Sequence, residues 1–143
     1  VKDLSFENPG APEVYQHQQT PQIDVQFNIG REKLGDDLWE SILKLDVTAQ
    51  AEDGKTAFKV ELVYAALFRL IDVPEEQVQP FLLVDGPAMI FPYARRILAD
   101  AVRDGNFPAL MLEPIDFASL YVQQQQQMAQ GGSDNVDMPT GNA

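Results

Sequence analysis

Few side chains in this sequence could carry out acid–base or nucleophilic chemistry. His17 is the single histidine, and it lies in a glutamine-rich stretch that offers no second group to orient an imidazole. We therefore interpret it as a solvated loop residue rather than a general base. The acidic pairs Asp36-Asp37 and Glu75-Glu76 are each adjacent in sequence, and neighbours along a strand or helix point in different directions, so neither makes a ready metal site. We expect no catalytic residues and no bound metal.

Binding sites for common cofactors and for nucleic acid are also missing from the sequence. There is no cysteine, and the glycines at Gly30, Gly54 and Gly86 are isolated rather than arranged as a phosphate-binding loop, so we expect no cofactor. The formal net charge of −12 over 143 residues argues against nucleic acid and against anionic lipid. No apolar stretch approaches the ~20 residues of a membrane span, and residues 1–9 lack a secretory signal. We expect no direct membrane insertion and a cytoplasmic location.

Alternation of apolar and polar residues predicts four β-strands, at about 2–8, 22–30, 38–50 and 56–70. The second strand is the clearest case, because Val25 and Phe27 alternate with polar neighbours. Asp53-Gly54 supplies a tight turn between the last two strands. Consecutive strands joined in this way favour an antiparallel sheet.

Helical spacing of apolar residues follows in the second half, at about 74–84, 88–104 and 116–128. We expect residues 85–87 (Asp-Gly-Pro) to separate the first two helices, Gly105 to end the second, and Asp116 to cap the third. Strands followed by helices predict the α+β class with a four-stranded antiparallel sheet. We expect one domain over 1–130 and a disordered acidic tail over 131–143.

The sequence carries more apolar side chains than one small sheet with its helices is expected to bury. Residues 63–68 are apolar at positions that face both sides of the last strand, and the loop between the last two helices adds Phe107, Leu110 and Leu112. Burying a large apolar side chain stabilises a protein by about 1.5–3 kcal/mol, so leaving several in water would be costly. We expect subunit contacts and a groove for apolar segments of other proteins to use this surface. Periodicity alone does not divide residues between these two uses.

Several short motifs resemble the SecB family of protein-export chaperones, and their order and spacing match along nearly the whole chain, from Lys2 to about Gln127. They are residues 2–9 (KDLSFENP), 56–58 (TAF), 90–95 (IFPYAR), 104–108 (DGNFP) and 110–117 (LMLEPIDF). The resemblance implies a homotetramer built as a dimer of dimers. Each subunit would hold a four-stranded sheet backed by helices, with a crossover loop between the first two strands. It also implies an ATP-independent holdase that binds unfolded preproteins in hydrophobic grooves and delivers them to the SecA translocase motor.

The resemblance assigns two candidate sites. The SecA-binding residues would be Asp3, Glu7 and Glu61 on the solvent-exposed face of the sheet. Without the resemblance, these three residues would be interpreted as ordinary solvated charges. Lys59 stands where the family often has leucine, and we expect it to weaken or retune that contact. The residues proposed for the peptide groove, some of which we expect in the core, are Tyr15, Phe58, Phe68, Leu82, Phe91 and Tyr93.

The crossover loop departs from the family pattern, because Gln19 and Thr20 stand before Pro21 where a tryptophan is common. We therefore expect the aromatic wall that this tryptophan would form to be absent. The only tryptophan, Trp39, lies on the core-facing side of its predicted strand, where we expect it to pack. Two alternatives to the holdase stay open: an acidic adaptor or scaffold that recognises one folded partner, and a small-molecule-binding or enzymatic α+β domain.

Overall fold

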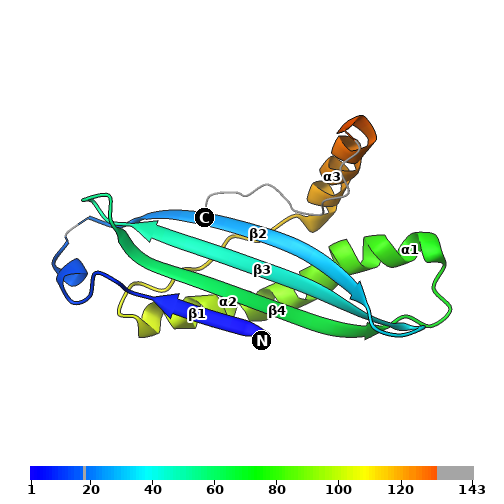
Figure 1. The fold of residues 1–143 in the computed structure, drawn as a ribbon, viewed down its shortest axis with the longest axis horizontal. Coiled ribbons are helices and arrows are strands. Elements are labelled where there is room, and N and C mark those ends of the chain that lie inside the picture. The colour runs from blue at the N-terminus through cyan, green and yellow to red at the C-terminus, as the bar shows by residue number, and fades with distance from the viewer. Residues whose placement is uncertain (18, 132–143) are drawn as a thin grey trace.

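The computed structural model describes residues 1–17 and 19–131, which form a four-stranded antiparallel sheet with helices packed on one face (Figure 1). The predicted α+β class is confirmed. The predicted acidic tail lies, from residue 132 on, outside the described residues. The strands are β1 (Asp3–Glu7), β2 (Gln22–Lys33), β3 (Leu38–Gln50) and β4 (Thr56–Arg69), in the spatial order β1-β4-β3-β2.

The register of the sheet brings apolar residues from all four strands together on one face. Leu45 of β3 lies opposite Phe27 of β2 and Leu62 of β4, and Phe6 of β1 lies opposite Val60. Because the side-chain period of a strand is two, the intervening residues point to the other face. The inner face therefore packs against the helices, and the outer face of the sheet is left without a covering layer in the described chain.

The two predicted helices before residue 105 form one continuous helical segment. The segment consists of α1 (Glu75–Pro80), a π-helical turn η2 (Phe81–Asp85) and α2 (Gly86–Asp104), which follow one another without a gap. The predicted break between two helices at residues 85–87 was therefore wrong. The wide turn explains how the helix continues here, because the N–H of Gly86 donates to the carbonyl of Phe81, five residues back. α2 crosses the inner face of the sheet (Figure 1).

A buried serine on the sheet completes this irregular turn. In the π register the carbonyl of Leu82 would accept from residue 87, but Pro87 has no N–H. The hydroxyl of Ser41, fully buried on β3, donates to that carbonyl at 2.8 Å instead. Gly86 allows the close approach, since a Cβ there would lie 2.6 Å from the Ser41 oxygen.

The ends of the helices follow from local residues. α2 ends at Asp104, as predicted. The residue with left-handed backbone after the helix is Asn106 (φ 68°), not Gly105. A glycine is required at 105 for a different reason, because a Cβ there would overlap the ring of Phe6. α3 (Phe117–Gly131) begins after Asp116, whose carboxylate accepts from the N–H of Ser119 at 3.1 Å and from its hydroxyl at 2.7 Å. The predicted N-cap is thus confirmed.

Within the described residues, no helix combines the length and apolar character needed to cross a membrane.

Candidate functional site

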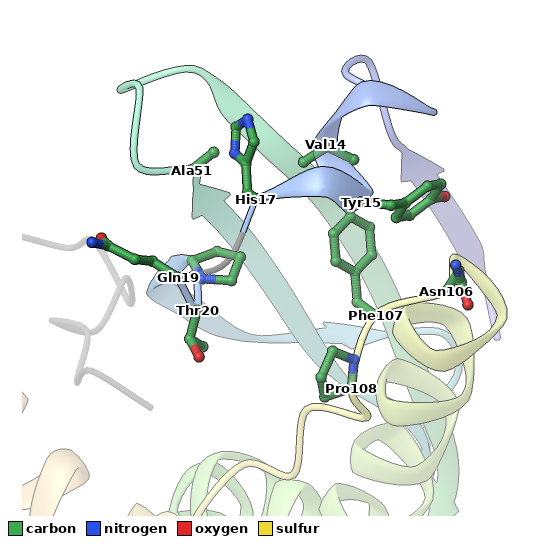
Figure 2. A pocket seen from close by; sticks show the side chains of 10 residues that line it. Val14, Tyr15, His17, Gln19, Thr20, Ala51, Asn106, Phe107 and Pro108 are labelled. Atoms are coloured by element: carbon green, nitrogen blue, oxygen red, sulfur yellow. The ribbon is translucent and has the colours of Figure 1, made fainter.

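A hollow of about 290 Å³ lies where the crossover segment between β1 and β2 meets the loop after α2 (Figure 2). The crossover segment, residues 8–21, contains a short 3-10 helix, η1 (Glu13–Gln16), whose Val14 is buried against the core. Figure 2 shows the ring of Phe107 lying close to this segment. Gln19 and Thr20, near the C-terminal end of the segment, also line the hollow. The lining residues are Val14, Tyr15, His17, Gln19, Thr20, Pro21, Ala51, Asn106, Phe107 and Pro108.

Four aromatic rings support one wall of this hollow. The Phe107 ring lies 4.7 Å from that of Phe58 and 5.7 Å from that of Tyr15, and Phe6 stacks on Phe58 at 6.0 Å. Such contacts stabilise a defined ring arrangement beyond the area they bury. Phe107 therefore stands on a fixed aromatic base that reaches into the core of the sheet.

A chain of hydrogen bonds ties the crossover segment to the end of α2. The side-chain amide of Asn8 donates to the Tyr15 hydroxyl at 2.7 Å, and that hydroxyl donates to the carbonyl of Gly105 at 2.9 Å. The carbonyl lies at the C-terminus of α2, where helix carbonyls lack intrahelical donors. These bonds hold the two walls of the hollow together.

The lining of the hollow has apolar and uncharged polar groups but no Lys, Arg, Asp or Glu. The Nδ1 atom of His17 is buried and has no hydrogen-bond partner in the described part of the chain. No group of three His, Asp or Glu side chains in that part could hold a metal ion. The arrangement suits apolar side chains and the neutral amides of a peptide backbone.

The six residues predicted for a peptide groove are distributed over different environments. Tyr15 lines the hollow and is partly exposed, and Tyr93 is exposed on α2. Phe68 is half-buried and packs edge-on against Phe81 at 5.1 Å. The other three are buried in the core of the subunit: Phe58, Leu82 and Phe91.

Sequence reasoning did not assign Asn8, Gly105 or Phe107 to the groove. Phe107 was noted only as a surplus apolar residue in a loop. Its signal was the same motif, residues 104–108, that carried the family resemblance. Asn8 and Gly105 also lie in such motifs, but their roles depend on a hydrogen bond and a ring contact between distant segments, which the motifs do not indicate.

The acidic residues Asp3, Glu7 and Glu61 share the outer face of the sheet. Ser5 of β1 lies directly opposite Glu61 of β4, so Asp3 and Glu7 are the diagonal neighbours of Glu61. Diagonal positions on one sheet face lie about 7–8 Å apart, which groups the three carboxylates over two adjacent strands.

Two further residues modify this acidic patch. Lys59 forms an ion pair with Glu61 at 3.3 Å and lies opposite Glu7, which partly neutralises the patch. Asp46 of β3 lies directly opposite Glu61 and adds a fourth carboxylate to this patch.

Large apolar side chains remain exposed on both layers of the fold. Met89 and Tyr93 lie one turn apart on the side of α2 away from the sheet, and each is 58% exposed. On the outer sheet face Leu67 of β4 is 61% exposed. Ala65 precedes it by two residues on the same strand, and Ile42 lies opposite Ala65 on the neighbouring β3. The described subunit therefore leaves apolar surface open at several places.

Comparison with known proteins places this architecture among protein-export chaperones. The family model for "Preprotein translocase subunit SecB" matches residues 1–128. The chain is 56% identical to "Protein-export protein SecB" of Sphingopyxis alaskensis over 143 residues, covering 100% of this chain and 82% of the relative. It is 60% identical over 127 residues to the protein of that name in Zymomonas mobilis, covering 89% of this chain and 77% of the relative.

Among solved structures, the fold resembles a SecB-like chaperone of Mycobacterium tuberculosis in complex with a ChAD peptide from an antitoxin. The TM-score is 0.66 with 18% sequence identity, over 80% of this chain and 84% of that one. At this identity the likeness concerns the fold alone.

Proposed function

Because this chain belongs to the SecB family of preprotein-export chaperones, we propose that it is an ATP-independent holdase that captures unfolded preproteins in the hollow beneath the crossover segment. The observation that carries this proposal is the hollow itself, with its aromatic wall and its uncharged lining. No nucleotide takes part.

The chemistry of the hollow fits short stretches of unfolded chain. Phe107 and Val14 offer apolar surface to aromatic or aliphatic side chains, and the amides of Gln19 and Asn106 offer hydrogen bonds to a peptide backbone. A folded protein would not present both groups at once, because its apolar side chains and backbone amides are buried. Unfolded clients are thus favoured over folded ones.

Delivery to SecA would use the acidic patch on the outer sheet face. Asp3, Glu7 and Glu61 lie on the face opposite the helices, so a partner bound there would not compete for the inner-face elements that form the hollow. A partner segment rich in Lys or Arg complements three clustered carboxylates. The Lys59–Glu61 ion pair reduces the negative charge available, and we expect it to moderate this contact.

The exposed apolar side chains support self-association into a homotetramer, a dimer of dimers. Met89 and Tyr93 form an apolar strip on the outer side of α2, which is suited to pack against another copy. Size-exclusion chromatography with light scattering checks this: a stable monomer at micromolar concentration would contradict it. The proposed location is the cytoplasm, where preproteins wait before export.

Aggregation assays test the holdase directly. Several unrelated proteins are diluted from denaturant with and without the chain, in the absence of ATP, and light scattering is followed. A holdase suppresses aggregation of all of them at near-stoichiometric ratios. An adaptor for one folded partner, the alternative function, would suppress none.

A further inference from the structure

The outer face of the sheet, turned away from α2 in Figure 1, carries an apolar stripe beside the acidic patch. Because strand residues alternate between faces, Val63, Ala65 and Leu67 of β4 follow Glu61 on this face, and Ile42 of β3 lies opposite Ala65. We call these four apolar residues the outer stripe. Leu67 is 61% exposed and the other three are half-buried. The stripe begins two residues, or about 7 Å, beyond Glu61.

The outer stripe departs from the pattern of the rest of this face. On β2 no outer position holds a large apolar side chain, since these positions are Gln22, Asp24, Gln26, Asn28, Gly30 and Glu32. An antiparallel sheet with one face in water normally keeps that face polar, and β4 does so only as far as Glu61. The described helices pack on the other face of the sheet (Figure 1), so they leave the stripe uncovered. The stripe is therefore the outer-face part of the apolar surplus at residues 63–68, and it is open to a partner.

The charges on this face select the kind of partner. Each cation on β1, β3 or β4 that lies on this face or reaches it forms an ion pair, at a distance between 2.8 and 3.9 Å: Lys2 with Glu40, Lys44 with Asp46, Lys59 with Glu61 and Arg69 with Asp37. Asp3 and Glu7 form no ion pair among the described residues. The unpaired charges beside the stripe are therefore negative in the described part of the chain, and they favour a partner that carries lysine or arginine.

Other occupants fit this face less well. A second copy docked through the same face would set two negatively charged surfaces against each other, and anionic lipid would be repelled in the same way. An acidic client segment meets the same repulsion. A segment that combines basic and aliphatic residues satisfies both the carboxylates and the stripe.

We propose that the outer stripe and the acidic patch form one composite surface, which binds a segment of the delivery partner in which large aliphatic residues follow lysine or arginine. The proposal rests on the proposed delivery to SecA through the acidic patch, and it adds an apolar requirement to that contact. Leu67 lies about 20 Å from Glu61 along the same strand, so an extended segment needs about six residues to span the surface. Because salt screens charge pairs but not apolar contacts, part of the affinity should persist at high salt.

Short fluorophore-labelled peptides test the composite surface on the full chain. The first peptide carries lysines in one half and leucines in the other, the second has serines in place of the leucines, and the third has glutamates in place of the lysines. An unlabelled unfolded protein is present at saturating concentration to occupy the client hollow. Measured by fluorescence anisotropy, the lysine–leucine peptide should bind about tenfold more tightly than the lysine–serine peptide and at least about tenfold more tightly than the glutamate–leucine peptide.

Substitutions of Leu67 separate apolar from electrostatic binding. Leu67→Thr keeps a side chain suited to a strand, and it should weaken binding of the lysine–leucine peptide about tenfold while leaving the lysine–serine peptide unchanged. Leu67→Glu adds a carboxylate, so a purely electrostatic surface would bind the lysine–leucine peptide more tightly, whereas the outer stripe predicts weaker binding. The matched control is Val122→Thr, which removes an apolar side chain of similar exposure, 52%, from α3 and should leave binding unchanged.

Equal binding of the lysine–leucine and lysine–serine peptides, unchanged binding by Leu67→Thr, or tighter binding by Leu67→Glu would overturn the composite surface. Loss of lysine–leucine binding when the unfolded protein is added would overturn it too, because the stripe would then be a client surface.

Calorimetry with purified SecA separates this inference from the proposed function. A SecA affinity that falls for Asp3→Lys with Glu61→Lys but not for Leu67→Thr contradicts the role of the stripe and leaves delivery standing. If the parent chain does not bind SecA at all, delivery is contradicted, and the peptide comparison still decides whether the composite surface exists.

Discussion

The hydroxyl of Tyr15 donates a 2.9 Å hydrogen bond to the carbonyl oxygen of Gly105, joining residues 90 positions apart in the sequence. Tyr15 belongs to the crossover segment and Gly105 to the end of α2, the two sides of the proposed client groove. The bond is partly exposed, so water can replace it at modest cost. It therefore helps to keep the crossover segment against the end of α2.

Tyr15→Phe should loosen the crossover segment without unfolding the subunit. The ring contact with Phe107 is kept, and the two lost hydrogen bonds, from Asn8 and to Gly105, contribute about 0.5–1.5 kcal/mol each. A glutamate-specific protease should then cleave after Glu13 several-fold faster than in the parent protein. Cleavage after Glu52, in the β3–β4 turn, is the internal control and should not change. Equal acceleration at both sites would indicate global destabilisation and contradict the local role.

Ser41→Ala should destabilise the whole fold. It removes the hydroxyl that donates to the Leu82 carbonyl, and both residues are fully buried, so the cost is about 1–3 kcal/mol. Urea denaturation followed by circular dichroism measures this. Ser5→Ala, on the outer face of β1, is the matched control and should change stability by less than about 0.5 kcal/mol. Equal midpoints for the two variants would show that the π-turn does not need the hydroxyl.

Asp3→Lys combined with Glu61→Lys should weaken SecA binding at least about tenfold at low salt, since it reverses two charges of one patch. Calorimetry with purified SecA measures this. Asp24→Lys with Glu32→Lys makes the same charge change on the outer face of β2 and should have a much smaller effect. Unfolded-protein binding should be unchanged in both variants. Undiminished SecA affinity in the first variant would remove the site assignment.

The cap of α3 should make part of the stability depend on acid pH. Hydrogen bonds from the Ser119 hydroxyl, and then from the N–H groups of Ser119 and Ala118, lower the pKa of Asp116 below its ordinary 3.8. A group whose pKa is depressed on folding contributes stability that is present above the unfolded pKa and is lost as pH falls through the folded one.

Thermal unfolding of the parent and of Asp116→Ala tests this cap. The difference between their midpoints should be constant above about pH 5 and should shrink below pH 3.8 as the carboxylate protonates. The difference between the midpoints of Asp116→Asn, which keeps an acceptor but does not titrate, and Asp116→Ala should not shrink at low pH. A parent-minus-alanine difference that persists at low pH would contradict the assignment.

The strands were predictable because their signal is local. Phe27, Leu45 and Leu62 each sit at alternating positions, and the register brings them to one inner face as the pattern requires. The cap at Asp116 was predictable for the same reason, since all its partners lie within three residues.

The continuous helix and the groove could not be predicted because their causes are not local. Residues 85–87 normally end a helix, and they continue here because Ser41, some forty positions earlier, satisfies a carbonyl that Pro87 leaves free. Aromatic residues on the apolar side of a strand or helix, such as Phe58 of β4 and Phe91 of α2, have the same sequence signature whether they line a groove or fill the core. Only the packing of α2 on the sheet separates these cases.

Hydrogen–deuterium exchange with and without a bound unfolded protein tests the central claim most directly. If clients occupy the hollow between the crossover segment and the loop after α2, amides in residues 8–21 and 105–108 should become protected together, and amides on the solvent face of α3 should not. Protection confined to other surfaces, or none at saturating client, would contradict the account.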